Sequence, residues 1–182
     1  MEIEIRAKVD SLEEMKEKLI SMGAKVFGSK FQHDVIYKRE DQVDTVQKPG
    51  SFILRVRESS TGHKLTFKSL TDVVGSWIEH ETKIEDPKET RLMLEKSGFV
   101  PVLVFDKERE EGKLGEITFC LDRMPELGEF IELEIISDDV YAGKKKLLEL
   151  ILKLGYSEKD IIHKGYVAIL MERQGVKYEN TG

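Results

Sequence analysis

Three pairs of glutamates, each with one residue between its members, are the residues of this sequence best suited to chemistry. They are Glu2 and Glu4, Glu79 and Glu81, and Glu132 and Glu134. Each pair lies in a segment that is predicted to be a β-strand, and around Glu2 and Glu4 charged and apolar residues alternate, which predicts one apolar face. Residues i and i+2 of a strand lie about 6.6 Å apart on one side, so paired carboxylates repel unless a cation lies between them. Three pairs brought together would form an oxygen-rich site for Mg²⁺ or Mn²⁺, which bind carboxylates and substrate phosphates.

Arginines and lysines on the predicted strands could bind those phosphates. Arg55 and Arg57 share one face of the segment SFILRVRE, for example. Arginine offers a rigid fork that suits phosphate oxygens, and lysine offers a point charge. The charged face that we expect holds seven anions and nine cations: Glu2, Glu4, Arg6, Lys8, Arg55, Arg57, Lys64, Lys68, Glu79, Glu81, Lys83, Lys107, Arg109, Asp122, Glu132 and Glu134. Its net charge of +2 contrasts with −6 for the whole chain, which favours a face that binds a polyphosphate–metal complex.

An ordinary antiparallel sheet with one face in water is the alternative that the pattern alone leaves open. Its charged residues would then form surface ion pairs of little energetic consequence. The near absence of Ser, Asn and Gln from these positions, and the pairing of the carboxylates, argue for a site.

Each glutamate pair is followed by a predicted helix, so a strand–turn–helix pattern recurs three times. Two helices begin at capping residues, Ser11 and Asp86, each with a glutamate three residues later. The third is expected from Ala142, and glycines end all three, at 23, 98 and 155. A shorter helix is expected from Ser157. Residues 38–51 are expected to form a long loop, and the chain after residue 173 a frayed tail.

Composition limits the class of protein. The chain has 182 residues, of which 40% are hydrophobic and 35% charged, as in a soluble globular protein. The single cysteine, Cys120, excludes an internal disulfide. It is expected to be a small filler of the sheet, and its place two residues before Asp122 leaves open that it faces the site. No apolar run approaches the roughly 20 residues that span a bilayer, and the N-terminus lacks the layout of a signal peptide, so a cytoplasmic location is predicted. The net charge of −6 argues against binding along nucleic acid.

The ordered series of motifs resembles the CYTH superfamily, the triphosphate tunnel metalloenzymes. Glu2-x-Glu4-x-Arg6 is similar to the family signature ExExK. The likeness continues through Asp34-x-x-Tyr37, LRVRE at 54–58, LTFK at 65–68, Glu79-x-Glu81, Lys107-x-Arg109, LDR at 121–123, Glu132-x-Glu134 and GYVAILM from Gly165. Within the superfamily the chain is most similar to the class IV adenylyl cyclase group, whose relatives include thiamine triphosphatases and inorganic tripolyphosphatases.

The resemblance implies an α+β fold: an eight-stranded antiparallel closed β-barrel, or tunnel, with a charged interior and helices packed outside. It implies one tunnel domain over residues 1–172, a tail over 173–182, Mg²⁺ or Mn²⁺ as cofactor, a small-molecule triphosphate as substrate, and it allows a homodimer. The implied metal ligands are Glu2, Glu4, Glu79, Glu81, Asp122, Glu132 and Glu134. The implied phosphate-binding residues are Arg55, Arg57, Lys64, Lys68, Lys107 and Arg109. Catalytic roles are implied for Arg6, Lys8 and Lys83.

Two residues depart from the family pattern. Arg6 replaces the signature lysine, and a guanidinium with a pKa above about 12 cannot serve as a base. Gly165 stands where the cyclase-like group often has serine. Three functions therefore stay open: conversion of ATP to cyclic AMP and pyrophosphate, hydrolysis of thiamine triphosphate, tripolyphosphate or another triphosphate, and binding of a nucleotide or polyphosphate without turnover.

Overall fold

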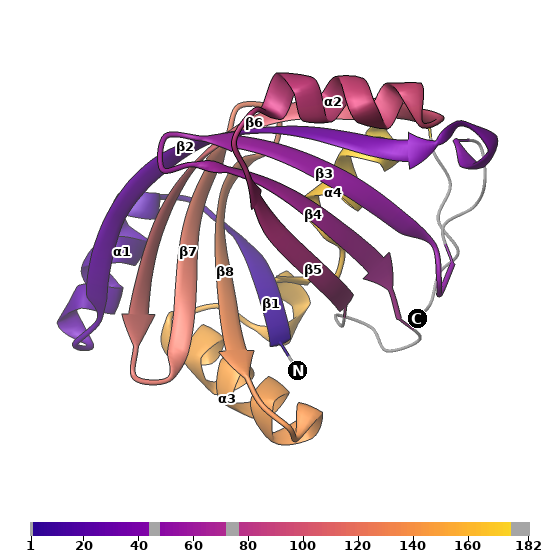
Figure 1. Cartoon of the computed structure of the whole chain (residues 1–182). Coiled ribbons are helices and arrows are strands. Elements are labelled where there is room, and N and C mark those ends of the chain that lie inside the picture. Colours follow the sequence, from indigo (N-terminus) through magenta and orange to yellow (C-terminus); the bar gives the residue numbers. More distant parts are fainter. Residues whose placement is uncertain (1, 44–47, 72–76, 176–182) are drawn as a thin grey trace. The chain divides into compact units, whose positions relative to one another are not determined.

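The structure is a computed structural model that describes residues 2–43, 48–71 and 77–175 (Figure 1). It combines a large antiparallel sheet with four α-helices. The strands are β1 (Glu2–Val9), β2 (Lys25–Arg39), β3 (Phe52–Ser59), β4 (His63–Leu70), β5 (Trp77–Ile84), β6 (Phe99–Leu114), β7 (Ile117–Met124), β8 (Gly128–Ile136) and β9 (Ile161–Ile162). The helices are α1 (Leu12–Ser21), α2 (Pro87–Lys96), α3 (Val140–Lys153) and α4 (Tyr166–Arg173), with 3₁₀ turns η1 (Glu40–Gln42) and η2 (Glu158–Asp160).

The strands follow the order β5-β4-β3-β2-β6-β7-β8-β1-β9. The predicted antiparallel sheet is confirmed, but across the described residues hydrogen bonds do not close it into a barrel, because β5 and β9 end the order. At the outer edge of β1, the two residues of β9 pair with Arg6 and Ala7. The eight-stranded tunnel with a charged interior therefore stays a prediction.

The chain divides into two compact units. Unit 1 comprises residues 1–31 and 107–163, and unit 2 comprises residues 32–106 and 164–182. Both long strands, β2 and β6, contribute to each unit.

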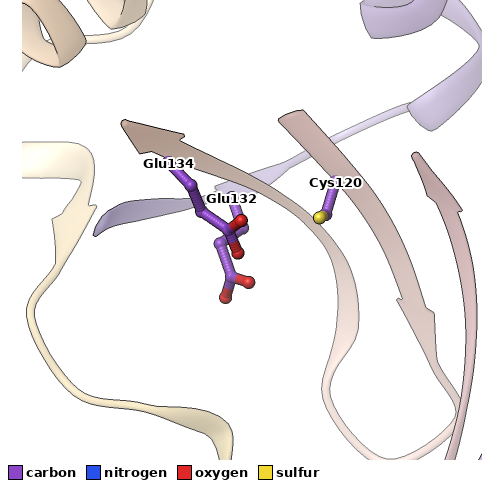
Figure 2. Close-up of side chains that lie close together, drawn as sticks. All are labelled: Cys120, Glu132 and Glu134. Atoms are coloured by element: carbon purple, nitrogen blue, oxygen red, sulfur yellow. The ribbon is translucent and has the colours of Figure 1, made fainter. Parts of the chain in front are cut away.

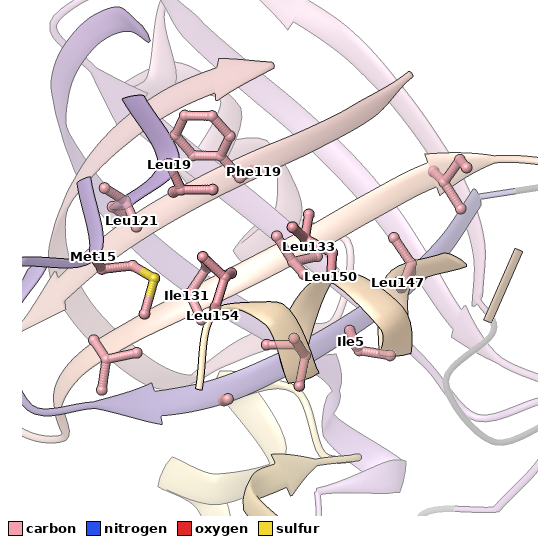
Figure 3. Close-up of a cluster of buried hydrophobic side chains, with 14 of the residues drawn as sticks. Ile5, Met15, Leu19, Phe119, Leu121, Ile131, Leu133, Leu147, Leu150 and Leu154 are labelled. Carbon is pink, nitrogen blue, oxygen red and sulfur yellow. The ribbon is translucent and has the colours of Figure 1, made fainter. Parts of the chain in front are cut away.

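In unit 1, α1 and α3 bury the apolar side chains of β1, β7 and β8 (Figure 3). Leu147 and Leu150 of α3 and Met15 and Leu19 of α1 are buried in this core. From the sheet come Ile5, Phe119, Leu121, Ile131 and Leu133. Burial of one such side chain contributes about 1.5–3 kcal/mol. Because strand residues alternate, burying this face presents the charged residues on the other.

A glycine inside α3 lets the helix approach β1. A Cβ atom at Gly143 would lie 2.4 Å from Cδ1 of Ile3, so a side chain there would have to displace the end of Ile3. Glycine costs a helix interior about 1 kcal/mol relative to alanine, and here it leaves room for Ile3.

The predicted helix starts are confirmed, with one shift. The Ser11 and Asp86 side chains accept hydrogen bonds from the backbone N–H groups of Glu14 and Glu89. The third helix begins at Val140, two residues before the predicted start, because Asp139 caps it. The short helix expected from Ser157 is only the 3₁₀ turn η2, despite its capping box.

In unit 2, α2 packs on β3 around a smaller core that contains Val35, Tyr37 and Val56. The loop predicted for residues 38–51 was wrong at its start, because β2 continues to Arg39. Lys38 is buried at 2% exposure and its Nζ donates to the carbonyl of Val43. Residues 44–47 of that loop and 176–182 of the predicted tail lie outside the described residues. Among the described helices, none has the length and apolar character that a membrane crossing requires.

Candidate functional site

Strand register gathers the charged residues of β1, β6, β7 and β8 on one face of unit 1. Glu4 and Arg6 of β1 lie opposite Glu134 and Glu132 of β8. Across the other edge of β8, Cys120 of β7 also lies opposite Glu132. We call the resulting group the unit 1 cluster: Glu2, Glu4, Arg6, Lys107, Arg109, Cys120, Asp122, Glu132 and Glu134.

Arg109 joins the two buried carboxylates of this cluster. Its Nε and Nη2 donate to both oxygens of Asp122, at 2.7 and 2.6 Å, and Nη2 also donates to Glu132 at 2.9 Å. The Asp122 side chain is fully buried, and Lys107 lies 3.8 Å from it. A bidentate arginine fixes the geometry of a carboxylate as well as its charge.

Arg6, which replaces the signature lysine, is held by carboxylates. Its Nη2 forms a buried ion pair with Glu132 and lies 3.4 Å from Glu4. Only 5% of Arg6 is exposed. In this position Arg6 orients Glu132 and Glu4.

The cations and carboxylates set the charge of the cluster. Burial alone would raise the pKa values of Glu132 and Asp122, but the neighbouring cations outweigh burial and hold both pKa values below their usual range. For Glu132 these cations are Arg6, Arg109 and Lys107. Glu134 differs, because burial and the negative charge of Glu132 raise its pKa to about 9. A proton, or a metal ion, would relieve the repulsion there.

Two groups of possible metal ligands share Glu134. Carboxylate oxygens of Glu2, Glu4 and Glu134 lie within 4.8 Å of one another, and so do the ligand atoms of Cys120, Glu132 and Glu134 (Figure 2). The first group fits Mg²⁺ or Mn²⁺, which are bound by a few carboxylates together with water and substrate phosphates. Mutual repulsion among its carboxylates is what a divalent cation would offset.

The second cluster, in unit 2, also begins with a bidentate pair. Arg57 of β3 donates to both oxygens of Asp34 on β2, each at 2.6 Å, and the Asp34 side chain is fully buried. Arg55 lies on the same face and donates to Thr66 at 3.1 Å. We call this group the unit 2 cluster: Asp34, Arg55, Arg57, Lys64, Thr66, Lys68, Glu79, Glu81 and Lys83.

The unit 2 cluster contains more cations than its carboxylates neutralise. Lys64 of β4 lies opposite Arg57 on one side and Lys83 of β5 on the other, although like charges directly opposite destabilise a sheet. Burial, and then the charge of Arg57, lower the pKa of Arg55. The Nε of Arg55 is buried and has no hydrogen-bond partner among the described residues. Such an arrangement suits an anion that carries several charges.

The glutamates of β5 are paired with these cations. Glu79 lies 3.3 Å from both Arg55 and Lys68, and Glu81 forms an ion pair with Lys64. Burial would raise the pKa of Glu81, but its hydrogen bond with Lys64 helps to lower it.

The family of the chain follows from a sequence comparison. The model of the CYTH domain matches residues 1–166. The chain belongs to the CYTH family. Among curated proteins, this CYTH protein is 29% identical over 174 residues to a Methanocaldococcus jannaschii protein described as a "putative adenylate cyclase", covering 93% of this chain and 98% of that protein.

Solved structures share the fold of this CYTH chain. The Pyrococcus horikoshii protein PH1012 is similar with a TM-score of 0.82 and 30% identity, over 92% of this chain and 98% of that one. A Hippeastrum protein described as a "putative adenylyl cyclase" with a dominant triphosphatase activity is similar with a TM-score of 0.68 and 19% identity, over 100% and 99% of the two chains. At that identity the second likeness concerns the fold alone.

The predicted site residues of this CYTH chain fall into both units. Unit 1 holds nine of them: Glu2, Glu4, Arg6, Lys8, Lys107, Arg109, Asp122, Glu132 and Glu134. Unit 2 holds seven: Arg55, Arg57, Lys64, Lys68, Glu79, Glu81 and Lys83. Lys8 and Lys83, predicted to be catalytic, are both exposed. The groups of three metal ligands found among the described residues include neither Glu79, Glu81 nor Asp122, which instead pair with cations.

Sequence patterns missed two members of the charged faces, Asp34 and Lys38. The motif Asp34-x-x-Tyr37 assigns Asp34 no role in the site, and the loop predicted for residues 38–51 includes Lys38. Both lie in QHDVIYK, where apolar residues on both faces of the strand hide the alternation. The sequence places Cys120 on the face of Asp122 as a small filler, and its ligand atom lies within 4.8 Å of carboxylate oxygens of Glu132 and Glu134.

Proposed function

We propose that this chain is a metal-dependent enzyme that acts on a triphosphate, with Glu2, Glu4 and Glu134 as ligands of Mg²⁺ or Mn²⁺. The convergence of these three carboxylate oxygens within 4.8 Å is the observation that carries the proposal. When bound, the metal would neutralise phosphate oxygens and stabilise the charge that develops during their transfer. Glu132 is then the residue that Arg6 and Arg109 hold ionised beside the metal ligands.

Each cluster contains cations that we assign to phosphate binding. In unit 1 these are Lys107 and Arg109, whose Nε and Nη2 also bind carboxylates. In unit 2 they are Arg55, Arg57, Lys64 and Lys68. We assign Glu79, Glu81 and Asp122 to orienting these cations rather than to metal, because each is in an ion pair with one of them. Partly exposed pairs contribute about 0–1 kcal/mol, so phosphate can replace Glu79 and Glu81.

Cyclisation of ATP is the first reaction to test, since the M. jannaschii relative is described as a "putative adenylate cyclase". In that reaction the ribose 3′-hydroxyl attacks the α-phosphorus and pyrophosphate leaves. Hydrolysis, in which water attacks a phosphorus atom, is the second candidate. A lysine at this position could accept the proton of the hydroxyl, whereas Arg6 cannot, so we assign Arg6 to positioning Glu132 and Glu4 rather than to catalysis. The Hippeastrum protein, whose fold is similar, is itself described as having a dominant triphosphatase activity.

Product identification separates these reactions. The full chain is incubated with ATP, thiamine triphosphate or tripolyphosphate, in Mg²⁺ and in Mn²⁺, and cyclic AMP, pyrophosphate and phosphate are measured. Cyclic AMP with pyrophosphate indicates a cyclase, and release of phosphate indicates a hydrolase. Binding by calorimetry without turnover of any substrate would instead identify a binding protein.

Two variants test the metal ligands. Glu4→Gln removes one carboxylate charge from the metal group and is expected to lower turnover by about 100-fold or more. The matched control is Glu116→Gln, because Glu116 is an exposed glutamate that pairs only at the surface with Lys146. Equal turnover of the Glu4→Gln variant and the control would exclude Glu4 as a metal ligand.

A further inference from the structure

We propose that Cys120, Glu132 and Glu134 form a second cation site, of mixed sulfur and oxygen ligands, that selects zinc-class ions such as Zn²⁺ and Cd²⁺ over Mg²⁺. Figure 2 shows the three side chains converging from β7 and β8. Their ligand atoms, one sulfur and two carboxylate oxygens, all lie within 4.8 Å of one another.

The pairing of β7 with β8 fixes the relative positions of these three residues. Cys120 lies directly opposite Glu132 in the register of β7 and β8, and Glu134 follows two residues later on the same side of β8. The ligand atoms of a tetrahedral zinc site lie about 3.5 Å apart, so small rotations of the two glutamate side chains would complete the site. The sheet itself need not move.

Cys120 is buried on the charged face of the sheet rather than in the apolar core of unit 1. It is 1% exposed and does not belong to the buried apolar residues of the unit 1 core. Its thiol is free rather than part of a disulfide. Glu132 is oriented by Arg6 and Arg109, and a carboxylate with about four lone-pair positions can bind a cation as well.

The ligand types determine which ions bind. A thiolate is a soft ligand that favours zinc-class ions, whereas Mg²⁺ takes oxygen ligands almost exclusively. On binding, the thiol of Cys120 loses its proton to solvent and its sulfur donates a lone pair to the ion, with no change of oxidation state. Three protein ligands and one open position are the arrangement found where a zinc ion also binds water or substrate.

The shared residue Glu134 connects this site to the proposed magnesium site. An ion bound to Cys120, Glu132 and Glu134 withdraws Glu134 from Glu2 and Glu4. Zinc-class ions should therefore inhibit turnover supported by Mg²⁺. This consequence rests on the proposed function, whereas the binding itself does not.

The binding test uses Cd²⁺ added to the metal-free full chain, because a Cd²⁺–thiolate bond gives an ultraviolet charge-transfer absorption. Cys120 is the only cysteine, so the band reports this residue alone. We expect the band to saturate at one equivalent, to be displaced by Zn²⁺, and to persist in excess Mg²⁺. Cys120→Ser should abolish it, and Glu134→Gln should weaken Cd²⁺ binding at least about tenfold.

Glu4→Gln is the matched comparison, since Glu4 belongs only to the other ligand group. It should keep the band with an affinity within about threefold of the unaltered chain. Absence of the band, or an unchanged Cd²⁺ affinity in both Glu134→Gln and Glu132→Gln, would overturn the proposed site. Circular dichroism of each variant identifies any that fails to fold. If Glu132→Gln fails to fold, the Cd²⁺ affinity of Glu134→Gln alone decides the test.

The two proposals can fail separately. A band without turnover of any triphosphate would leave the sulfur-containing site in place and refute the enzyme. Turnover in Mg²⁺ without a Cd²⁺–thiolate band would support the enzyme and refute the sulfur-containing site. Where both hold, the Zn²⁺ concentration that halves turnover should rise at least about tenfold in Cys120→Ser relative to the unaltered chain.

Discussion

Replacing Arg109 by methionine should destabilise the protein far more than removing an exposed arginine from the neighbouring strand. Arg109 donates three hydrogen bonds, two to Asp122 and one to Glu132, and both carboxylates are buried. Without it, Asp122 keeps Lys107 at 3.8 Å as its nearest cation in the unit 1 cluster. Breaking a buried ion pair by removing one partner costs about 3–5 kcal/mol, because the remaining charge stays buried without compensation.

The matched control is Arg123→Met on β7. The side chain of Arg123 is 46% exposed and pairs with Glu13 and Glu129 at the surface. Its loss should lower the free energy of unfolding by no more than about 1 kcal/mol. Urea denaturation followed by circular dichroism measures both variants against the unaltered chain.

A further variant identifies the cause of the loss. Adding Asp122→Asn to Arg109→Met replaces the unpaired carboxylate by a neutral amide, so it should recover part of the lost stability. Losses of about 1 kcal/mol or less for Arg109→Met, or no recovery in the double variant, would mean that Asp122 is solvated and that the pair has little structural importance.

Three further predictions concern pH, packing and phosphate binding. In metal-free protein the pKa of Glu134 is about 9, above its value in the unfolded chain, so this group contributes stability that is fully present below about pH 4.5 and is lost as pH rises through about 9. In a chelator, the melting temperature of the unaltered chain should therefore fall between about pH 6 and about pH 10, and that of Glu134→Gln should fall less. Parallel plots of melting temperature against pH for the two proteins would exclude the raised pKa of Glu134. Gly112→Ala should cost about 1–3 kcal/mol in urea denaturation, because its Cβ would lie 2.1 Å from Cζ of Phe119 and 2.5 Å from the carbonyl oxygen of Lys25. Unchanged stability would show that Phe119 can move aside. Arg55→Gln should raise the KM for triphosphate by about 10-fold or more while the fold persists, since a hydrogen bond to a charged group contributes about 1.5–3 kcal/mol; an unchanged KM would remove Arg55 from phosphate binding.

Both clusters contain a buried carboxylate that is neutralised by an arginine in the same geometry. In each, a fully buried aspartate accepts hydrogen bonds from Nε and Nη2 of an arginine on the adjacent strand: Asp122 from Arg109, and Asp34 from Arg57. These rigid pairs hold part of the charged face in place. The carboxylates that we assign to metal lie outside these two pairs, whereas Arg57 and Arg109 are also among the residues that we assign to phosphate.

Local patterns were sufficient to predict most of the elements and the sidedness of the strands. Alternation in MEIEIRAK places Ile3 and Ile5 in the core and Glu2 and Glu4 on the other face, because strand side chains alternate whatever the rest of the chain does. The capping residues Ser11 and Asp86 likewise fix helix starts through bonds that span only three residues.

Tertiary structure alone decided which charges meet. Arg6 and Glu132 are 126 residues apart in the chain, and only the register of β1 with β8 makes them partners. The same register brings Glu134 close to both Glu2 and Glu4, and β7 adds a thiol to Glu132 and Glu134. A sequence lists residues able to bind an ion, but the distances among them depend on strand pairing and burial. Those distances decide whether a carboxylate is held by arginine, retains its proton, or is available to a metal.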